Sequence, residues 1–148
     1  MSKIISFRGT LAPTEQERVR LTTLNGKTGY LIKKFQVIEI TPGQSDVELI
    51  CKIYTKSQAG AVSNTVEFTE SDLLAVAWRE GTSSKETGDN ETIIFDNEKF
   101  NQDIYVTMHD AAGNTVSGNY YIELEVVNLS DLEATMLTLK NLRTISSR

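Results

Sequence analysis

The one neighbouring pair of residues suited to acid–base chemistry is His109 and Asp110, in the stretch "DIYVTMHDAAGNTVSG". A carboxylate can orient an imidazole as a general base, but such a base acts on a nucleophile held at hydrogen-bond distance. Nothing nearby in the sequence supplies that nucleophile in a fixed relation to His109. The alternation of apolar side chains over residues 104–108 places His109 on the outer face of a strand. Asp110 and Gly113 fit the first and fourth positions of a type I turn, so this corner is predicted to be structural.

Two other stretches have suitable residue types but not the spacing for a ligand site. "GKT" at 26–28 looks like the end of a phosphate-binding loop, but Leu21 stands where that motif needs a glycine, and a strand should follow instead of a helix. The oxygen-bearing side chains of "FDNEKFNQD" would suit calcium, but they lack the spacing and the glycine of an EF-hand. A polar corner between two strands is the favoured interpretation of this group, which comprises Asp96, Asn97, Glu98, Asn101 and Asp103.

The chain has one histidine and one cysteine, which cannot build a usual zinc site or an intrachain disulfide. Cys51 shares the apolar parity of Val47, Leu49 and Ile53 in "VELICKIYT", so it is predicted to be a core residue rather than a reactive thiol. Taken together, the motifs predict no catalytic residue, no cofactor and no metal site, and therefore a protein that is not an enzyme.

Length and composition are those of one globular domain spanning residues 1–148, with 39% hydrophobic and 24% charged residues. A net charge of −5 does not favour a nucleic-acid partner. The sequence does not begin with an apolar leader and has no 18-residue apolar run, so neither a signal peptide nor a membrane span is expected.

The charge is unevenly distributed along the chain. Residues 1–60 hold nine Lys/Arg and five Asp/Glu, whereas residues 61–148 hold six and fifteen, which gives +4 and −9. The two halves could simply interleave in the fold. Alternatively, they could form oppositely charged surfaces that suit subunits meeting head to tail.

Short apolar segments separated by turn residues predict eight strands. In one of them the apolar parity changes towards Ile38 and Ile40, which predicts a bulge or a bend near Val37. In another, Val66 and Phe68 are expected to point inward. The segments are "KIISFRG", "QERVRLTTL", "YLIKKFQVIEI", "VELICKIYT", "AVSNTVEF", "TIIFD", "DIYVTMH" and "NYYIELEVV".

Two helices are predicted as well. In "TESDLLAVAWREG", Thr69 and Asp72 are spaced as a cap, apolar residues follow at helical spacing, and Gly81 can end a short helix near residues 70–80. The C-terminal segment has a stronger start signal, because Ser130 and Glu133 can form a capping box and Leu129 can act as a hydrophobic staple.

The C-terminal helix carries two apolar stripes. The stronger one is expected to face the domain and contains Leu132, Met136, Leu139 and Leu142. The weaker one either faces solvent or touches a neighbour, and it contains Ala134, Leu137 and Ile145.

Eight short strands without regular alternation of strands and helices predict a mainly β fold with two antiparallel sheets packed face to face. A jelly-roll-like sandwich is the first choice and an immunoglobulin-like sandwich the second.

Three stretches of the second half of the chain resemble a group of small proteins encoded by marine tailed phages: "LLAVAW", "TIIFDNEKFNQDIYVT" and "NYYIELEVVNLSDLEATMLTLKNLR". The resemblance implies a virion structural protein, either a capsid, decoration or tail component. Such a protein would be assembled in the host cytoplasm and located in the virion. Its partners would be its own copies and other virion proteins, with no direct nucleic-acid contact and no membrane.

The favoured function is therefore a structural subunit that self-assembles. Leu137 and Ile145 are candidates for an interface, and "SKIISFRGT" could add a strand to a neighbour's sheet edge.

Two rival functions remain open. A carbohydrate-binding or adhesive module is one, because "VTMHDAAGNTVSG" resembles the DxxGN hairpin of bacterial immunoglobulin-like domains. That module would be favoured by Tyr105 lying with Tyr120 or Tyr121 on one exposed face. An enzyme is the other, and it would be favoured by a deep pocket with converging carboxylates.

Overall fold

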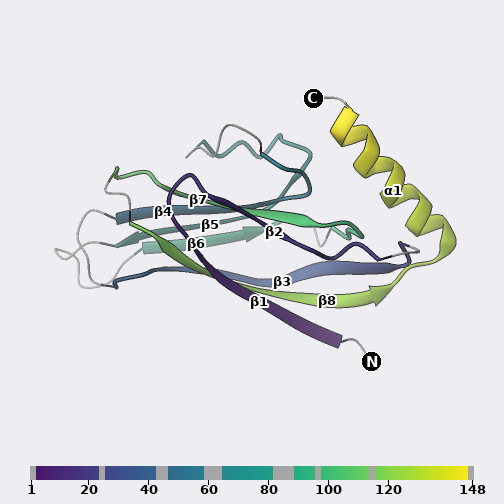
Figure 1. The fold of residues 1–148 in the computed structure, drawn as a ribbon, viewed down its shortest axis with the longest axis horizontal. Helices are drawn as coiled ribbons and strands as arrows, with labels where there is room; N and C mark the ends of the chain where they lie inside the picture. Colours follow the sequence, from purple (N-terminus) through teal and green to yellow (C-terminus); the bar gives the residue numbers. More distant parts are fainter. Residues whose placement is uncertain are drawn as a thin grey trace.

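The computed structural model describes residues 3–23, 26–42, 47–58, 65–81, 89–95, 98–113 and 116–146. Over these residues the chain is mainly β, with one C-terminal helix at one end of the molecule (Figure 1). The elements are β1 (Lys3–Leu11), β2 (Gln16–Val19), β3 (Thr28–Glu39), β4 (Val47–Tyr54), β5 (Leu73–Gly81), β6 (Asp89–Ile94), β7 (Ile104–Asp110), β8 (Gly118–Asn128) and α1 (Asp131–Ser146).

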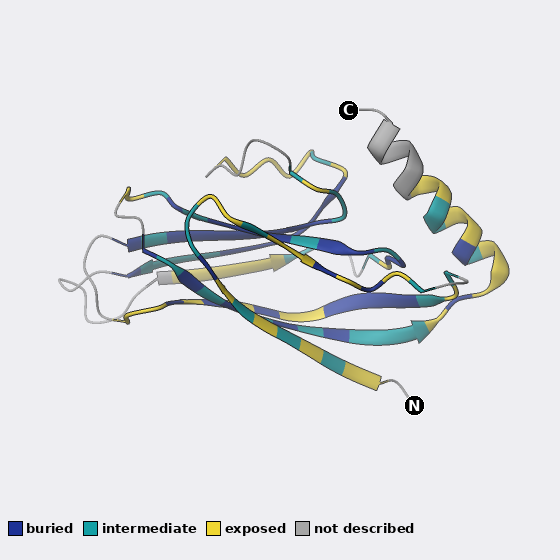
Figure 2. Ribbon diagram, viewed as in Figure 1, coloured by how far each residue is buried: buried dark blue, intermediate teal, exposed yellow. Residues whose placement is uncertain are grey.

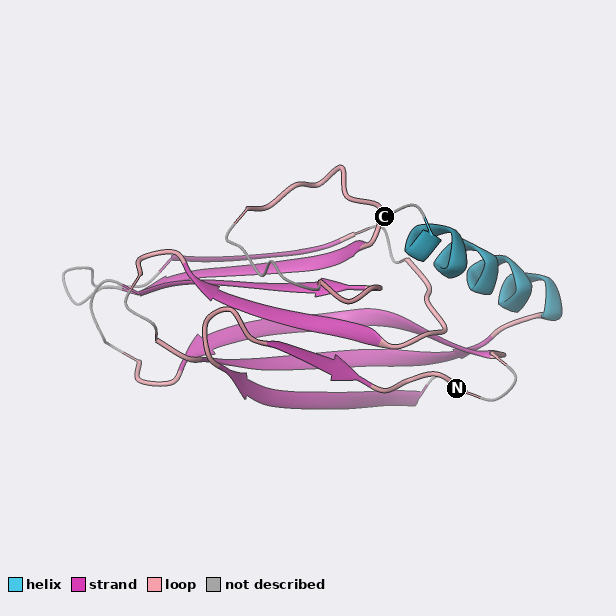
Figure 3. Ribbon diagram, turned by 45° about the horizontal axis from the view of Figure 1, so that its top comes forward, coloured by secondary structure: helices cyan, strands magenta, loops and turns pink. Residues whose placement is uncertain are grey.

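The strands form two antiparallel sheets, one with the order β1-β8-β3 and the other with the order β2-β7-β4-β5-β6. They pack face to face as layers of a sandwich (Figure 3), which confirms the predicted fold class. In a jelly roll the first strand pairs with the last, the second with the second-last, and so on. The resulting ribbon of strand pairs folds over into two sheets. The pairs β1·β8, β2·β7 and β4·β5 follow that scheme. Strand β6 departs from it, because it pairs with β5 instead of β3.

The main core lies between the two sheets, where the facing strands are buried (Figure 2). Strand β4 shows why: its apolar side chains at alternate positions point into the sandwich, as the sequence predicts. Val47, Leu49, Cys51 and Ile53 are each at most 1% exposed. Both sheets contain strands from both halves of the sequence, so the two charged halves interleave and do not form separate surfaces.

The helix predicted near residues 70–80 is wrong, because this segment is strand β5. Its first five residues are all buried, since β5 is covered on both faces. Ala75 and Ala77 lie in the main core, whereas Leu73 and Val76 pack with β4 residues on the opposite face. A strand buried on both sides has a continuous apolar run, which periodicity cannot distinguish from a buried helix.

The strand predicted over "AVSNTVEF" is also wrong for its described part. Residues 65–68 form no strand, and Val66 and Phe68 are exposed; residues 61–64 lie outside the described residues. This segment crosses the outer face of the five-stranded sheet, where Lys52 donates a 2.6 Å hydrogen bond to the carbonyl of Thr65. The Phe68 ring meets Phe95 edge-on, with the ring centroids 5.0 Å apart. The eight observed strands thus match the expected number, although one of them lies elsewhere in the sequence.

The bulge of β3 is at Lys33, between Ile32 and Lys34, and not near Val37. Beyond it, Val37 stays buried while Ile38 and Ile40 are exposed. The inward position after Val37 is taken by Glu39, which is 1% exposed and accepts a 2.5 Å bond from the Nε of Arg79. Hydrophobic patterning fails here because a buried carboxylate with a cationic partner occupies a core position.

The capping box of α1 is confirmed. The Ser130 hydroxyl accepts a hydrogen bond from the Glu133 backbone at 3.2 Å, and the Glu133 carboxylate accepts one from the Ser130 backbone at 3.3 Å. Leu129 is buried against Gly29, where an added Cβ would lie 2.7 Å from the leucine side chain. These contacts fix where the helix leaves β8.

The orientation of α1 is the reverse of the expected one. Ala134 is buried, whereas Leu132, Met136 and Leu139 are 69%, 60% and 52% exposed. The side chains of Leu142 and Ile145 lie outside the described residues. Three ion pairs hold the helix in this orientation and tie it to the segments before β3 and β7: Lys27–Asp131, Lys99–Glu133 and Lys140–Glu98.

Replacing Ser130 with alanine should reduce the free energy of unfolding by about 1 kcal/mol, because one backbone N–H at the helix start loses its acceptor. Urea unfolding followed by circular dichroism measures this difference. A Thr135→Ala variant, one turn further into the helix, serves as the control and should change stability less. Equal stability of the wild type and Ser130→Ala would show that the capping box contributes nothing.

Candidate functional site

A turn begins at Asp110, as predicted, and His109 lies in β7, where it pairs with Ile50 of β4. The Gly113 N–H donates to the carbonyl of Asp110 at 3.1 Å, and Gly113 has a positive φ of 81°. Both carboxylate oxygens of Asp110 accept backbone N–H groups, from Glu48, Ala112 and Val116 at 3.0–3.2 Å. These bonds aim the carboxylate at the backbone, where it holds the ends of the turn.

The polar corner formed by residues 98–103 is likewise structural in its described part. Glu98 pairs with Lys140, and the Asn101 amide donates to the carbonyl of Gly26 at 3.0 Å. Asp96 and Asn97 lie outside the described residues. Over the part of the chain that the structure describes, His, Cys, Asp and Glu side chains nowhere gather in threes as a metal site would need.

Asp103 is the most strongly bound carboxylate of this corner. Its Oδ1 accepts the backbone N–H groups of Leu21 and Thr22 at 2.7 and 2.9 Å, and its Oδ2 accepts the Nε of Arg18 at 2.6 Å. Burial alone would raise the pKa of Asp103, but the backbone donors and the guanidinium lower that pKa to about 2. Asp103 therefore ties the end of β2 to the start of β7.

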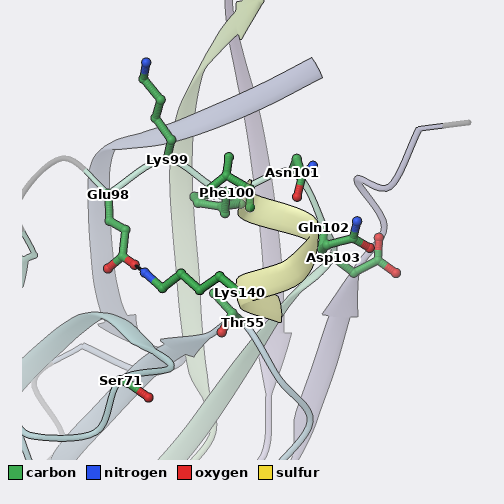
Figure 4. Close-up of a pocket in the computed structure, with 10 residues that line it drawn as sticks. Thr55, Ser71, Glu98, Lys99, Phe100, Asn101, Gln102, Asp103 and Lys140 are labelled. Atoms are coloured by element: carbon green, nitrogen blue, oxygen red, sulfur yellow. Dashed lines mark hydrogen bonds and ion pairs between the residues drawn. The ribbon is translucent and has the colours of Figure 1, made fainter. Parts of the chain in front are cut away.

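A cavity lies between this corner and α1 (Figure 4). Its volume is about 30 Å³, and Phe100, Asn101 and Leu137 are among the residues that line it. This is room for a water molecule or two and not for an organic substrate. Each carboxylate at its rim has its own cationic partner: Glu98 pairs with Lys140, and Asp103 binds Arg18. They do not converge on a common point, so the feature expected of an enzyme is not found in this pocket.

The tyrosines proposed for a binding platform are separated by the fold. Tyr120 points into the core and its hydroxyl donates to Glu17 of β2. Tyr121 lies on β8, beside a depression of about 520 Å³ on the outer side of the three-stranded sheet. Tyr105 lies on β7 of the other sheet, so it cannot share a face with Tyr121.

Two surface features of the described residues could take part in contacts with other molecules. The first is the apolar face of α1, formed by Leu132, Met136 and Leu139 at positions i, i+4 and i+7 of the helix. The second is the edge strand β1, which pairs with β8 on one side only. The pattern identified the three apolar residues of the helix but assigned them to the interior.

A scan against models of known protein families finds no match to this chain, and a search of curated proteins finds none either. Within the described residues, no helix has both the length and the apolar character that crossing a membrane requires.

The low pKa of Asp103 predicts an acid-dependent loss of stability. A carboxyl whose pKa falls from 3.8 to about 2 on folding stabilises the protein above pH 4, and this contribution is lost as the pH falls through about 2. The shift corresponds to about 2 kcal/mol. In Asp103→Asn, stability should therefore decline less steeply than in the wild type between pH 4 and pH 2. Urea midpoints across this range test the prediction, with Glu67→Gln, which changes an exposed carboxylate, as control. Parallel curves for the wild type and Asp103→Asn would contradict it.

Proposed function

We propose that this chain is a non-enzymatic structural subunit of a virus particle that acts by self-assembly. It would serve as a capsid, decoration or tail component of a phage, with its own copies and other virion proteins as partners. The virion, assembled in the host cytoplasm, would be its location. The assignment to a virion rests on the resemblance of its second half to proteins of marine tailed phages, and the assignment to assembly rests on the surface of the molecule.

The observation that carries the proposal is the exposed apolar face of α1. Leu132, Met136 and Leu139 lie on the side of the helix opposite the buried Ala134. Among the described side chains of the helix, these three large apolar residues point outward, whereas Ala134 is buried and Leu137 is partly buried beside the cavity. A contiguous apolar patch of this kind on a soluble protein is typical of an interaction site. In this orientation the ion pairs Lys99–Glu133 and Lys140–Glu98 join the helix to the segment before β7.

The jelly-roll-like architecture supports the same function, since viral capsid domains commonly use it. That support is an analogy of fold, and the fold also serves unrelated functions.

Replacing Leu132 and Leu139 with glutamine should weaken self-assembly while leaving the fold intact, because both side chains are exposed in the single chain and glutamine is compatible with a helix. Multi-angle light scattering over a range of protein concentrations measures the change in mass. The matched control is Ile38→Thr with Ile40→Thr, which removes similar exposed apolar area from the far end of β3. A wild-type protein that stays monomeric at high concentration and low salt would refute the proposal. So would equal loss of assembly in the two double variants.

A further inference from the structure

The main core is incompletely covered at two edges of the sandwich. Four apolar residues pack against it while remaining only partly buried, and three of them lie on edge strands: Ile5 and Phe7 on β1, and Ile94 on β6. The fourth is Val126 on β8, paired with Lys3 at the outer end of β1. At these places no described strand pairs with the outer edge of β1 or of β6.

Strand β1 is the outer strand of the three-stranded sheet, and its far edge pairs with none of the described strands. The outer side chains of β1 are exposed as well, with Ile4 at 51%. A long edge strand with apolar side chains is a ready template for another strand.

Strand β6 is the last strand on the opposite side of the sandwich. Its outer residues Glu91 and Ile93 are exposed, whereas Ile94 turns towards the core. The sequence of β6, "DNETII", contains no Lys or Arg. The sequence of β1, "KIISFRGTL", contains Lys3 and Arg8 and no Asp or Glu. The two edges thus have opposite charge. Among the described residues, no ion pair involves Arg8 or Glu91.

We propose that β1 of one copy pairs antiparallel with β6 of the next copy, so that the subunits join head to tail. The inference rests on the self-assembly proposed above and adds a contact at the sheet edges to the one proposed for α1. One antiparallel register places Arg8 opposite Glu91 on the outer face and Ile5 opposite Ile94 on the core face. Opposed residues on one face of a strand pair interact directly, and opposite charges or apolar pairs there are favourable. A parallel pairing that matched Arg8 to Glu91 would not match the two isoleucines.

This contact continues the three-stranded sheet of one copy into the five-stranded sheet of the next and covers the partly buried residues on both edges. Pairing β1 with β1 of a second copy would instead bring two positively charged strands together. Because β1 and β6 lie on opposite sides of the sandwich, the β1–β6 contact leaves a free edge on each end copy. It therefore repeats into a ring or a filament. Strand pairing alone buries less than the roughly 1,000 Å² of a stable interface, so assembly should require high protein concentration.

Cysteine cross-linking tests the contact on the full-length chain. Ser6 and Ile93 are exposed and directly opposite in the proposed register, and the natural Cys51 is fully buried. A short bis-maleimide should give a ladder of covalent oligomers with the Ser6→Cys/Ile93→Cys double variant. A mixture of the two single variants should stop at dimers, and each single variant alone should stay monomeric.

Charge reversal is a second test of the contact. Arg8→Glu and Glu91→Arg should each raise the concentration needed for half assembly about tenfold, and combining them should restore it. The double variant has the net charge of the wild type, and Lys34→Glu on β3 controls for charge change elsewhere. If light scattering shows assembly but the ladder and the charge rescue are both missing, this contact is wrong while the proposed function stands. Self-cross-linking of Ser6→Cys alone would indicate β1–β1 pairing and also overturn it. A monomer under all conditions would overturn both proposals.

Discussion

Strand β1 is the outer strand of the three-stranded sheet, and no described strand pairs with its free edge. Its side chains Ile5 and Phe7 pack against the main core while remaining only partly buried. The loop over residues 65–72 covers the outer face of the larger sheet, but no described segment covers β1.

Buried carboxylates bind the connections between strands. Asp110 binds three backbone N–H groups around its turn, and Asp103 binds the end of β2. Glu39 pairs with Arg79 across the two sheets. Charge-assisted hydrogen bonds of this kind are shorter and stronger than those between neutral groups. Each of these carboxylates is bound by groups of its own fold. What remains unused is surface, on α1 and at the two sheet edges.

Local chemistry predicted much of this fold, and tertiary context decided the rest. The alternation of β4, the burial of Cys51, the Asp110 turn and the capping box at Ser130 could all be derived from neighbouring residues. Strand β5 could not, because its burial on both faces comes from segments distant in sequence. Which face of α1 points outward could not be predicted from neighbouring residues either, because the contacts of the helix include Lys99 and other residues that are distant in the sequence. The charges of β1 and β6 can be read from the sequence. The position of these two strands at the edges of their sheets cannot.

The central claim is that a second copy completes the edge of β1. Amide hydrogen exchange measured by mass spectrometry, at increasing protein concentration, tests it most directly because it reports on the unpaired backbone itself. Peptides covering β1 and β6 should gain protection in step with the rise in mass, while β4, buried on both faces, should stay protected throughout. Unchanged exchange in β1 over a range where light scattering shows assembly would contradict the claim.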